Sequence, residues 1–241
     1  MPAIFITGTG TDAGKTYFAA LLVKALRAAG LNAGYYKAAV SGNTRDASGR
    51  LIAGDAERVV KIAGLSASPN SLVSYIYEAA VSPHLAARLE GTPPELAKIR
   101  ADYARLCREY AYVVVEGSGG IVCPLRRDGR STLMLSEVIK ELQLATVVVG
   151  TVGLGAINNF VLTAEYLQRH GIVCRGLVFN RFIASGGGAA NTLDAALADT
   201  LANDNMPVIA EITGLPVWGV LAPDAQKIEL TPEWLARIFE E

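Results

Sequence analysis

Short apolar runs alternate with segments of helical periodicity along nearly the whole chain. The runs that predict buried strands occupy residues 3–6, 32–37, 112–115, 145–149, 177–180 and 217–221. In the segments between them, apolar residues recur at the spacing of amphipathic helices. These segments predict a first helix that ends near Gly30, and further helices over 55–63, 84–89, 95–110, 136–142, 156–170, 189–202 and 232–239.

The alternation contains no internal repeat and no linker that would separate two domains. Strands and helices of these lengths in this order are typical of a parallel sheet. We therefore predict one α/β domain over residues 1–241, with a doubly wound, mostly parallel sheet of about seven strands and helices on both faces. Residues 66–94 fit the pattern least well, although they include Tyr75-Ile76-Tyr77.

A glycine-rich turn joins the first predicted strand to the first helix. Its residues 8–16 read GTGTDAGKT. This arrangement is typical of a phosphate-binding loop, in which backbone N–H groups and the helix N-terminus face the anion. Lys15 would neutralise the β- and γ-phosphates, and Thr16 would ligate Mg²⁺. Thr9 stands where the common pattern has its first glycine, so the alternative is an ordinary turn between strand and helix.

Two acidic residues are candidates for holding a metal ion beside this loop. Glu116 ends an apolar strand and precedes the small residues 117–120, GSGG. Asp55 begins a predicted helix, where the alternative role is that of an N-cap. Together with Thr16 these residues would supply the oxygen ligands that Mg²⁺ prefers.

Three polar residues at other strand ends are candidates for substrate contacts. Lys37 closes the second predicted strand, where a lysine is costly unless it meets an anion or its ammonium reaches solvent. We interpret it as a second cation beside Lys15, acting on the transferred phosphoryl group or on a substrate carboxylate. Ser41 follows at the same edge. Asn180 would either read the edge of a base or cap the following turn.

Composition and charge exclude several classes of protein. Hydrophobic residues make up 51% of the 241 residues, and the formal net charge is −1, so no basic field indicates a nucleic-acid partner. The most apolar segment, 144–157, is too short to span a bilayer, and the first residues do not resemble a signal peptide. Three widely spaced cysteines form no metal or disulfide pattern. We expect a cytoplasmic protein with no membrane contact.

Six motifs in the order of one family make the chain resemble dethiobiotin synthetases. The resemblance runs from residue 4 to about 180 and is loose in the last quarter of the chain. The motifs are 7–16 (TGTGTDAGKT), 36–37 with 41–42 (YK, SG), 55–56 (DA), 82–84 (SPH), 115–120 with 124–125 (VEGSGG, PL), and 153–158 with 162–163 (GLGAIN, LT).

The resemblance implies an ATP-dependent enzyme that closes a ureido ring. The family converts 7,8-diaminononanoate, CO₂ and ATP into dethiobiotin, ADP and phosphate. One amine of the substrate forms a carbamate, the carbamate attacks the γ-phosphate, and the second amine then displaces phosphate from the mixed anhydride. Mg²⁺ is the implied cofactor, held by Thr16, Asp55 and Glu116.

The resemblance also implies roles for individual residues. Lys15 and Lys37 would stabilise the transferred phosphoryl group and the carbamate, while Thr11 and Ser41 would contact the diamine or its carbamate. Asn180 would read the adenine. The family is a homodimer with its site at the interface, and the distal carboxylate of the substrate would bind to the helix start of the partner subunit. The residues implied for the nucleotide are Gly10, Asp12, Ala13, Gly14, Lys15, Thr16, Glu116 and Asn180, and those implied for the distal carboxylate are Gly155, Ala156, Ile157 and Asn158.

The chain departs from the family pattern at four positions. Gly10 replaces an aspartate, Asp12 a common glutamate, Ala38 a proline and Asn159 a common histidine. None of these changes removes a residue that the resemblance assigns to phosphoryl transfer. The changes concern the side chains of the loop and the carboxylate site.

Two other functions remain open at this point. A MinD/ParA-like ATPase switch would carry a signature lysine four residues before the last glycine of the loop, and this chain has Gly10 there. A related ATP-dependent synthetase acting on another substrate is the second alternative, because sequence does not determine which diamine is carboxylated.

Overall fold

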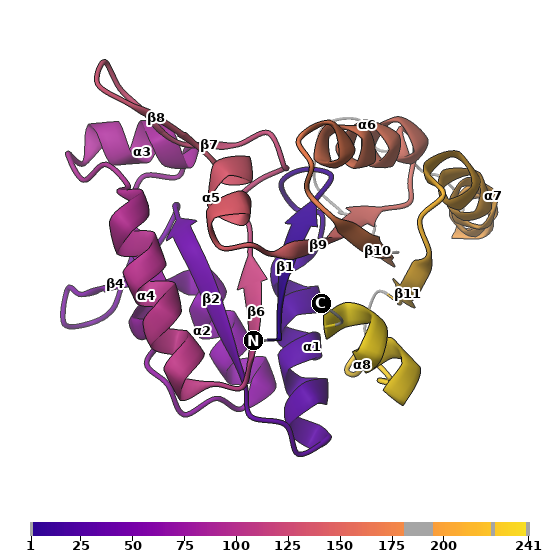
Figure 1. Ribbon diagram of the computed structural model, residues 1–241, viewed down its shortest axis with the longest axis horizontal. Helices are drawn as coiled ribbons and strands as arrows, with labels where there is room; N and C mark the ends of the chain where they lie inside the picture. Colours follow the sequence, from indigo (N-terminus) through magenta and orange to yellow (C-terminus); the bar gives the residue numbers. More distant parts are fainter. Residues whose placement is uncertain (1, 181–194, 223–224, 240–241) are drawn as a thin grey trace.

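Seven parallel strands form the centre of the molecule, and helices cover both faces of the sheet (Figure 1). The computed structural model describes residues 2–180, 195–222 and 225–239. The order of the strands is β11-β10-β9-β1-β6-β2-β5. Their bounds are β1 Ala3–Gly8, β2 Ala33–Val40, β5 Val73–Ile76, β6 Tyr112–Glu116, β9 Ala145–Thr151, β10 Cys174–Asn180 and β11 Val217–Leu221. The prediction of a doubly wound parallel sheet of about seven strands is confirmed.

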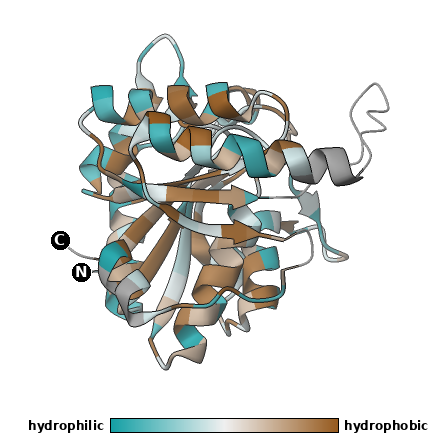
Figure 2. Ribbon diagram, turned by 90° about the vertical axis from the view of Figure 1, so that its right-hand side faces the viewer, coloured by the Kyte–Doolittle hydropathy of each residue, from teal (hydrophilic) through white to brown (hydrophobic). Residues whose placement is uncertain are grey.

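The helices follow from the right-handed crossovers that parallel strands require. Helices α1 and α2 pack against each other, whereas α4 contacts α5 and α6 contacts α7 in a second layer. Figure 2 shows the apolar strands enclosed between these layers. The bounds are α1 Lys15–Ala28, α2 Gly54–Ala63, α3 Pro83–Leu89, α4 Leu96–Glu109, α5 Leu135–Glu141, α6 Ala156–Arg169, α7 Ala195–Thr213 and α8 Pro232–Phe239, with a short 3₁₀ helix η1 at Pro69–Leu72.

Two small antiparallel hairpins lie outside the central sheet. The first pairs β3 (Thr44–Arg45) with β4 (Leu51–Ile52), and the second pairs β7 (Pro124–Arg127) with β8 (Thr132–Met134). Helix α3 lies against β7. The second hairpin therefore places the segment after β6 next to the segment that starts α3.

Several predicted element boundaries were wrong, among them the start of β10, which lies at Cys174 and not at 177, and one strand of the sheet was missed. Strand β2 continues three residues past Lys37 to Val40, because every side chain from 33 to 40 is buried and the strand pairs with β6 and β5. Residues 73–76, inside the irregular segment, form β5 on the edge of the sheet. Helix α7 runs on to Thr213 and includes Pro207, whereas the start predicted at 189 lies outside the described residues.

The strand register brings the candidate residues together at one edge of the sheet. Ile6 of β1 lies opposite Glu116 of β6, and Glu116 lies opposite Lys37 of β2. From β1 the chain crosses to β2 on one side, and it later returns to β9 on the other side. Ligands of open α/β sheets bind at the carboxyl ends of strands where the strand order reverses. The phosphate-binding loop starts at this edge.

Candidate functional site

The loop between β1 and α1 folds as a cradle of backbone N–H groups. Asp12 and Gly14 have φ angles of 59° and 93°, in the left-handed region, and Gly14 is the N-cap of α1. A Cβ atom on Gly14 would lie 2.1 Å from Nδ2 of Asn180, so no larger residue fits there. The predicted phosphate-binding conformation therefore depends on a glycine at 14. At position 9 the backbone still pairs with β9, because the Thr9 N–H donates to the carbonyl of Val149 at 3.0 Å.

Lys15 bends back over this loop and is nearly buried. Its ammonium donates to the carbonyl oxygen of Gly10 at 2.7 Å. Burial, and secondly the charge of Lys37, lower the pKa of Lys15 to about 8. No carboxylate in the part of the chain that the structure describes lies at ion-pair distance from Lys15. Its ammonium is therefore available for an anionic ligand, whose charge would restore the ordinary pKa.

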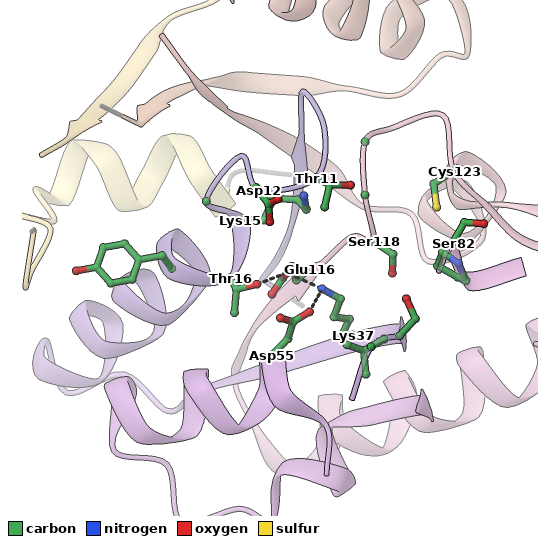
Figure 3. Close-up of a pocket in the computed structure, with 18 of the residues that line it drawn as sticks. Thr11, Asp12, Lys15, Thr16, Lys37, Asp55, Ser82, Glu116, Ser118 and Cys123 are labelled. Atoms are coloured by element: carbon green, nitrogen blue, oxygen red, sulfur yellow. Dashed lines mark hydrogen bonds and ion pairs between the residues drawn. The ribbon is translucent and has the colours of Figure 1, made fainter. Parts of the chain in front are cut away.

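Four side chains form a connected cluster beside the loop, which we call the carboxylate cluster: Thr16, Lys37, Asp55 and Glu116 (Figure 3). The Lys37 ammonium donates to Asp55 Oδ2 and to Glu116 Oε1, both at 2.6 Å. Thr16 donates its hydroxyl to the same Oε1 at 2.7 Å. Lys37 and Glu116 are 4% and 1% exposed, so the lysine does not reach solvent and the alternative of a surface lysine is wrong.

The charges in the cluster stabilise one another. Burial alone would lower the pKa of Lys37, but the neighbouring Glu116 and Asp55 carboxylates outweigh burial and raise it. Burial would raise the pKa of Asp55, and the Lys37 ammonium outweighs this and lowers it. Asp55 is the second residue of α2 rather than its N-cap, which is Ala53, so its carboxylate serves the cluster and not the helix end.

Tyr35 is a member of the site that sequence reasoning missed. This side chain is fully buried and donates its hydroxyl to Glu116 Oε2 at 2.7 Å. Burial, together with the nearby Glu116, raises its pKa well above the usual value, so the hydroxyl remains a donor. The signal was present, because residues 35 and 37 of one strand point to the same face of the sheet.

A cleft of about 1100 Å³ extends from the phosphate-binding loop across the carboxylate cluster. Ser41 lies on its wall, with its hydroxyl donating to the carbonyl of Val81 at 2.7 Å. The cleft also includes residues that were not predicted. These are Tyr17, Arg58, Gly42, Val81, Ser82, Ser118, Val122 and Cys123, among others.

Two of these additional residues sit at the α1 end of the cleft. The Arg58 guanidinium lies over the Tyr17 ring, 5.5 Å from its centroid, and the Tyr17 hydroxyl donates to the carbonyl of Ala225. At the other end, burial raises the pKa of Cys123 to about 11, so this thiol stays protonated. Tyr17, Arg58 and Cys123 could not be singled out from the sequence, since single residues of these types on helices and loops are common.

The predicted nucleotide and carboxylate residues fall in two places. Thr11, Asp12, Gly14 and Asn180 line the cleft. Asn180 is buried, and its Nδ2 donates to the carbonyl of Ala13 at 3.2 Å. The residues predicted for the distal carboxylate, 155–158, do not line this cleft; three of them line a separate hollow of about 480 Å³ at the start of α6.

The carboxylate cluster fits a divalent cation by its chemistry. Its acceptors are carboxylate oxygens beside a hydroxyl, and the positively charged Lys37 already lies between the two carboxylates. Hard oxygen ligands with few protein carboxylates are what Mg²⁺ uses when phosphates complete its coordination. In the described ranges no group of three or more His, Cys, Asp or Glu could hold a metal ion. A magnesium site here would therefore need the nucleotide.

Curated relatives share most of the chain. A sequence profile of the family described as "AAA domain" matches residues 2–229. The chain is 42% identical over 215 residues to the ATP-dependent dethiobiotin synthetase BioD of Clostridium botulinum (strain Eklund 17B / Type B), covering 89% of this chain and 88% of that protein. It is 39% identical over 227 residues to the ATP-dependent dethiobiotin synthetase BioD of Brachyspira hyodysenteriae (strain ATCC 49526 / WA1), covering 94% and 95%.

Solved structures share the fold. The MinC:MinD cell division protein complex of Aquifex aeolicus matches with a TM-score of 0.55 and 14% identity, covering 99% of this chain and 87% of that chain. A ParA family ATPase from Chlorobium tepidum TLS matches with a TM-score of 0.53 and 14% identity, covering 92% and 85%. At this identity the likeness concerns the fold alone.

Among the described residues, no helix is long and apolar enough to cross a membrane.

Proposed function

Since the chain belongs to the family of ATP-dependent dethiobiotin synthetases, we propose that it uses ATP and CO₂ to convert 7,8-diaminononanoate into dethiobiotin, ADP and phosphate. One observation carries this proposal beyond the family name. A second buried lysine, Lys37, stands next to the phosphate-binding loop, and the cleft continues past it to Ser41. That space would accommodate a second substrate beside the γ-phosphate.

The reaction has three steps that consume no other reagent. One substrate amine adds to CO₂ and loses a proton, which gives a carbamate. A carbamate oxygen attacks the γ-phosphorus and ADP leaves. The second amine attacks the carbamoyl carbon, the C–O bond to the phosphoryl group breaks, and phosphate leaves as the ring closes. The attacking amine of the last step also loses a proton. The second step brings the carbamate and the γ-phosphate, both anions, together, so the site must supply positive charge.

The two lysines would divide this task. Lys15 would lie along the β- and γ-phosphates, and Lys37 would stabilise the negative charge shared by the carbamate and the transferred phosphoryl group. Thr11, at the exposed tip of the loop, and Ser41, on the opposite wall, would hold the diamine or its carbamate. Both lysines are buried, which strengthens their interaction with anions.

The backbone of residues 10–14 would bind the phosphates. Gly10, Asp12, Ala13 and Gly14 would contribute N–H groups; Asp12 and Gly14 line the cleft. Asn180 would contact the adenine, and its amide also ties β10 to the loop through Ala13.

Thr16, Asp55 and Glu116 would hold Mg²⁺ together with the nucleotide. When bound, this ion would neutralise phosphate charge and orient the γ-phosphoryl group. Lys37 is hydrogen-bonded to both carboxylates, so it would share them with the metal ion.

We also propose that the chain works as a homodimer in the cytoplasm. Helices α6 and α7 lie side by side (Figure 1), and Leu154, Leu162 and Ile212 on this face are 88%, 56% and 57% exposed. An apolar face of this kind marks an interaction surface. It would bring residues 155–158 of one subunit toward the cleft of the other, where the N-terminus of α6 would bind the distal carboxylate.

The deciding experiment measures whether phosphate release depends on the diamine. Purified protein with Mg²⁺, ATP and ¹³C-bicarbonate is assayed with and without 7,8-diaminononanoate, and the product is identified by mass spectrometry. We expect phosphate release in step with a dethiobiotin that carries one ¹³C. Phosphate release that does not respond to the diamine would contradict the synthetase and favour an ATPase switch. Phosphate release with a different diamine, and none with 7,8-diaminononanoate, would assign that diamine as the substrate.

A further inference from the structure

Two adjacent tyrosines in β2 have the same burial and different partners. Tyr35 and Tyr36 are both 0% exposed. The hydroxyl of Tyr35 donates to Glu116 Oε2 at 2.7 Å, on the face of the sheet that carries Lys37. The hydroxyl of Tyr36 points to the opposite face, where it bonds to Ser74 Oγ at 2.7 Å and to the carbonyl of Ile99 at 3.1 Å.

The hydrogen bond of Tyr35 uses the oxygen of Glu116 that faces away from the loop. Oε1 accepts hydrogen bonds from Thr16 and from Lys37, whereas Oε2 accepts the one from Tyr35. The terminal torsion of a glutamate is broad and roughly two-fold, so the strand does not by itself determine the plane of the carboxylate. A donor on Oε2 removes that freedom from the side that is buried in the sheet.

The residue after Glu116 has no side chain that could hold the carboxylate. A Cβ at Gly117 would lie 2.9 Å from the ring of Phe5, and the Gly117 N–H continues the pairing with β1 by donating to the carbonyl of Ile6 at 2.9 Å. The hold on Oε2 comes instead from Tyr35 in the neighbouring strand β2.

We propose that Tyr35 is a positioning residue for Glu116. Its hydroxyl holds Oε2 and so keeps Oε1 directed at Thr16 and Lys37, where the magnesium nucleotide of the proposed function would bind. The inference rests on that function only for the identity of the metal ion. The hydrogen bonds from which it is argued all lie within the protein. Groups that orient a metal ligand typically change metal affinity by about 10–100-fold when they are removed.

The test compares Tyr35→Phe with Tyr36→Phe, which delete one hydroxyl each from neighbouring buried positions. Both variants lose buried hydrogen bonds, and thermal melts should show that both are less stable than the parent. Affinity for Mn²⁺ in the presence of ADP is measured from the EPR signal of free Mn²⁺. We expect about tenfold weaker Mn²⁺ binding in Tyr35→Phe and no change in Tyr36→Phe. Affinity for ADP with EDTA should be the same in all three proteins.

Equal Mn²⁺ affinity in the two variants would overturn the proposal, because it would make the Tyr35 bond merely structural. If Tyr35→Phe does not fold, p-aminophenylalanine at position 35 keeps the ring and replaces the hydroxyl by a weaker N–H donor. The looser hold on Oε2 should weaken Mn²⁺ binding several-fold, and the same replacement at 36 should not; no difference between the positions would again overturn the proposal. None of these measurements uses the diamine, so a failure of the synthetase assay and a failure of this proposal are distinguishable.

Discussion

Two buried lysines lie at the same edge of the sheet in opposite electrostatic surroundings. Lys15, at the start of α1, is bonded to a backbone carbonyl, and its pKa is lowered to about 8 by burial and by Lys37. Lys37, in β2, is bonded to two carboxylates, and its pKa is raised because they outweigh burial. Among the described residues, Lys15 has a carbonyl partner and no carboxylate at ion-pair distance, whereas Lys37 has two carboxylates.

The difference indicates separate duties. A cation without a carboxylate partner gains the most from an incoming phosphate, so Lys15 is suited to binding the nucleotide. Asp55 and Glu116 hold the Lys37 ammonium in a fixed position even without a ligand. Lys37 is therefore suited to binding a second substrate without rearrangement. The following experiments test this division.

The largest expected effect is that of Lys37→Gln on turnover. The glutamine cannot stabilise the charge shared by the carbamate and the phosphoryl group, so we expect kcat in the diamine-dependent assay to fall by about 10³-fold. Affinity for ADP should change little, because Lys15 and the loop remain. Lys61→Gln, at an exposed position of α2, is the control and should retain full activity. Unchanged turnover in a folded Lys37→Gln protein would remove Lys37 from the mechanism.

The two lysines should also differ in their contribution to stability. Lys37→Gln leaves two carboxylates close together without their cation, and we expect the free energy of unfolding at pH 7 to fall by about 3–5 kcal/mol. Lys15→Gln removes a charge that burial disfavours, so the free energy of unfolding should be no lower than in the parent. Urea titrations followed by circular dichroism measure both values. A comparable loss in the two variants would show that the lysines are not electrostatically different.

A smaller effect concerns the pH dependence of ADP binding. Lys15 would bind phosphate in its protonated form, and with a pKa of about 8 it loses its proton as the pH rises above that value. The affinity should therefore be nearly constant below pH 8 and fall by roughly tenfold per pH unit well above it. Calorimetry in two buffers of different ionisation enthalpy should detect proton uptake on binding near pH 8.

The Lys37 variant sharpens this last measurement. The charge of Lys37 is one cause of the lowered pKa of Lys15, so Lys37→Gln should move the fall in ADP affinity to higher pH. Lys15→Gln should show no fall in this range. If the parent and Lys15→Gln have the same pH profile, the titrating group is not Lys15.

Much of the site was predictable because its residues carry local signals. The loop of residues 8–16 has its own spacing, Glu116 ends an apolar run, and Lys37 is a charge in an apolar strand. Asn180 and Ser41 follow from their places at strand ends. The cleft contains all five features, as expected of ligand sites at the carboxyl edge of a parallel sheet.

Other features required the fold, because they depend on residues far apart in the chain. The continuation of β2 to Val40 and the existence of β5 come from pairing between strands, which local periodicity does not record. The contact of Tyr35 with Glu116 spans 81 positions, and Tyr17 and Arg58 meet because α1 packs on α2. The sequence left open whether Asp55 is an N-cap, because its contact with Lys37, 18 positions away, forms only in the folded protein.

The order of apolar and polar residues was sufficient to specify a parallel α/β sheet with a phosphate-binding loop, because backbone propensities and burial act over a few residues at a time. The tertiary structure alone decided that Lys37 is paired with two carboxylates, while no carboxylate of the described residues is paired with Lys15. That outcome depends on the register of β1, β6 and β2, which aligns Ile6, Glu116 and Lys37 in one row. Charges interact through space, and only the folded sheet determines which of them are neighbours.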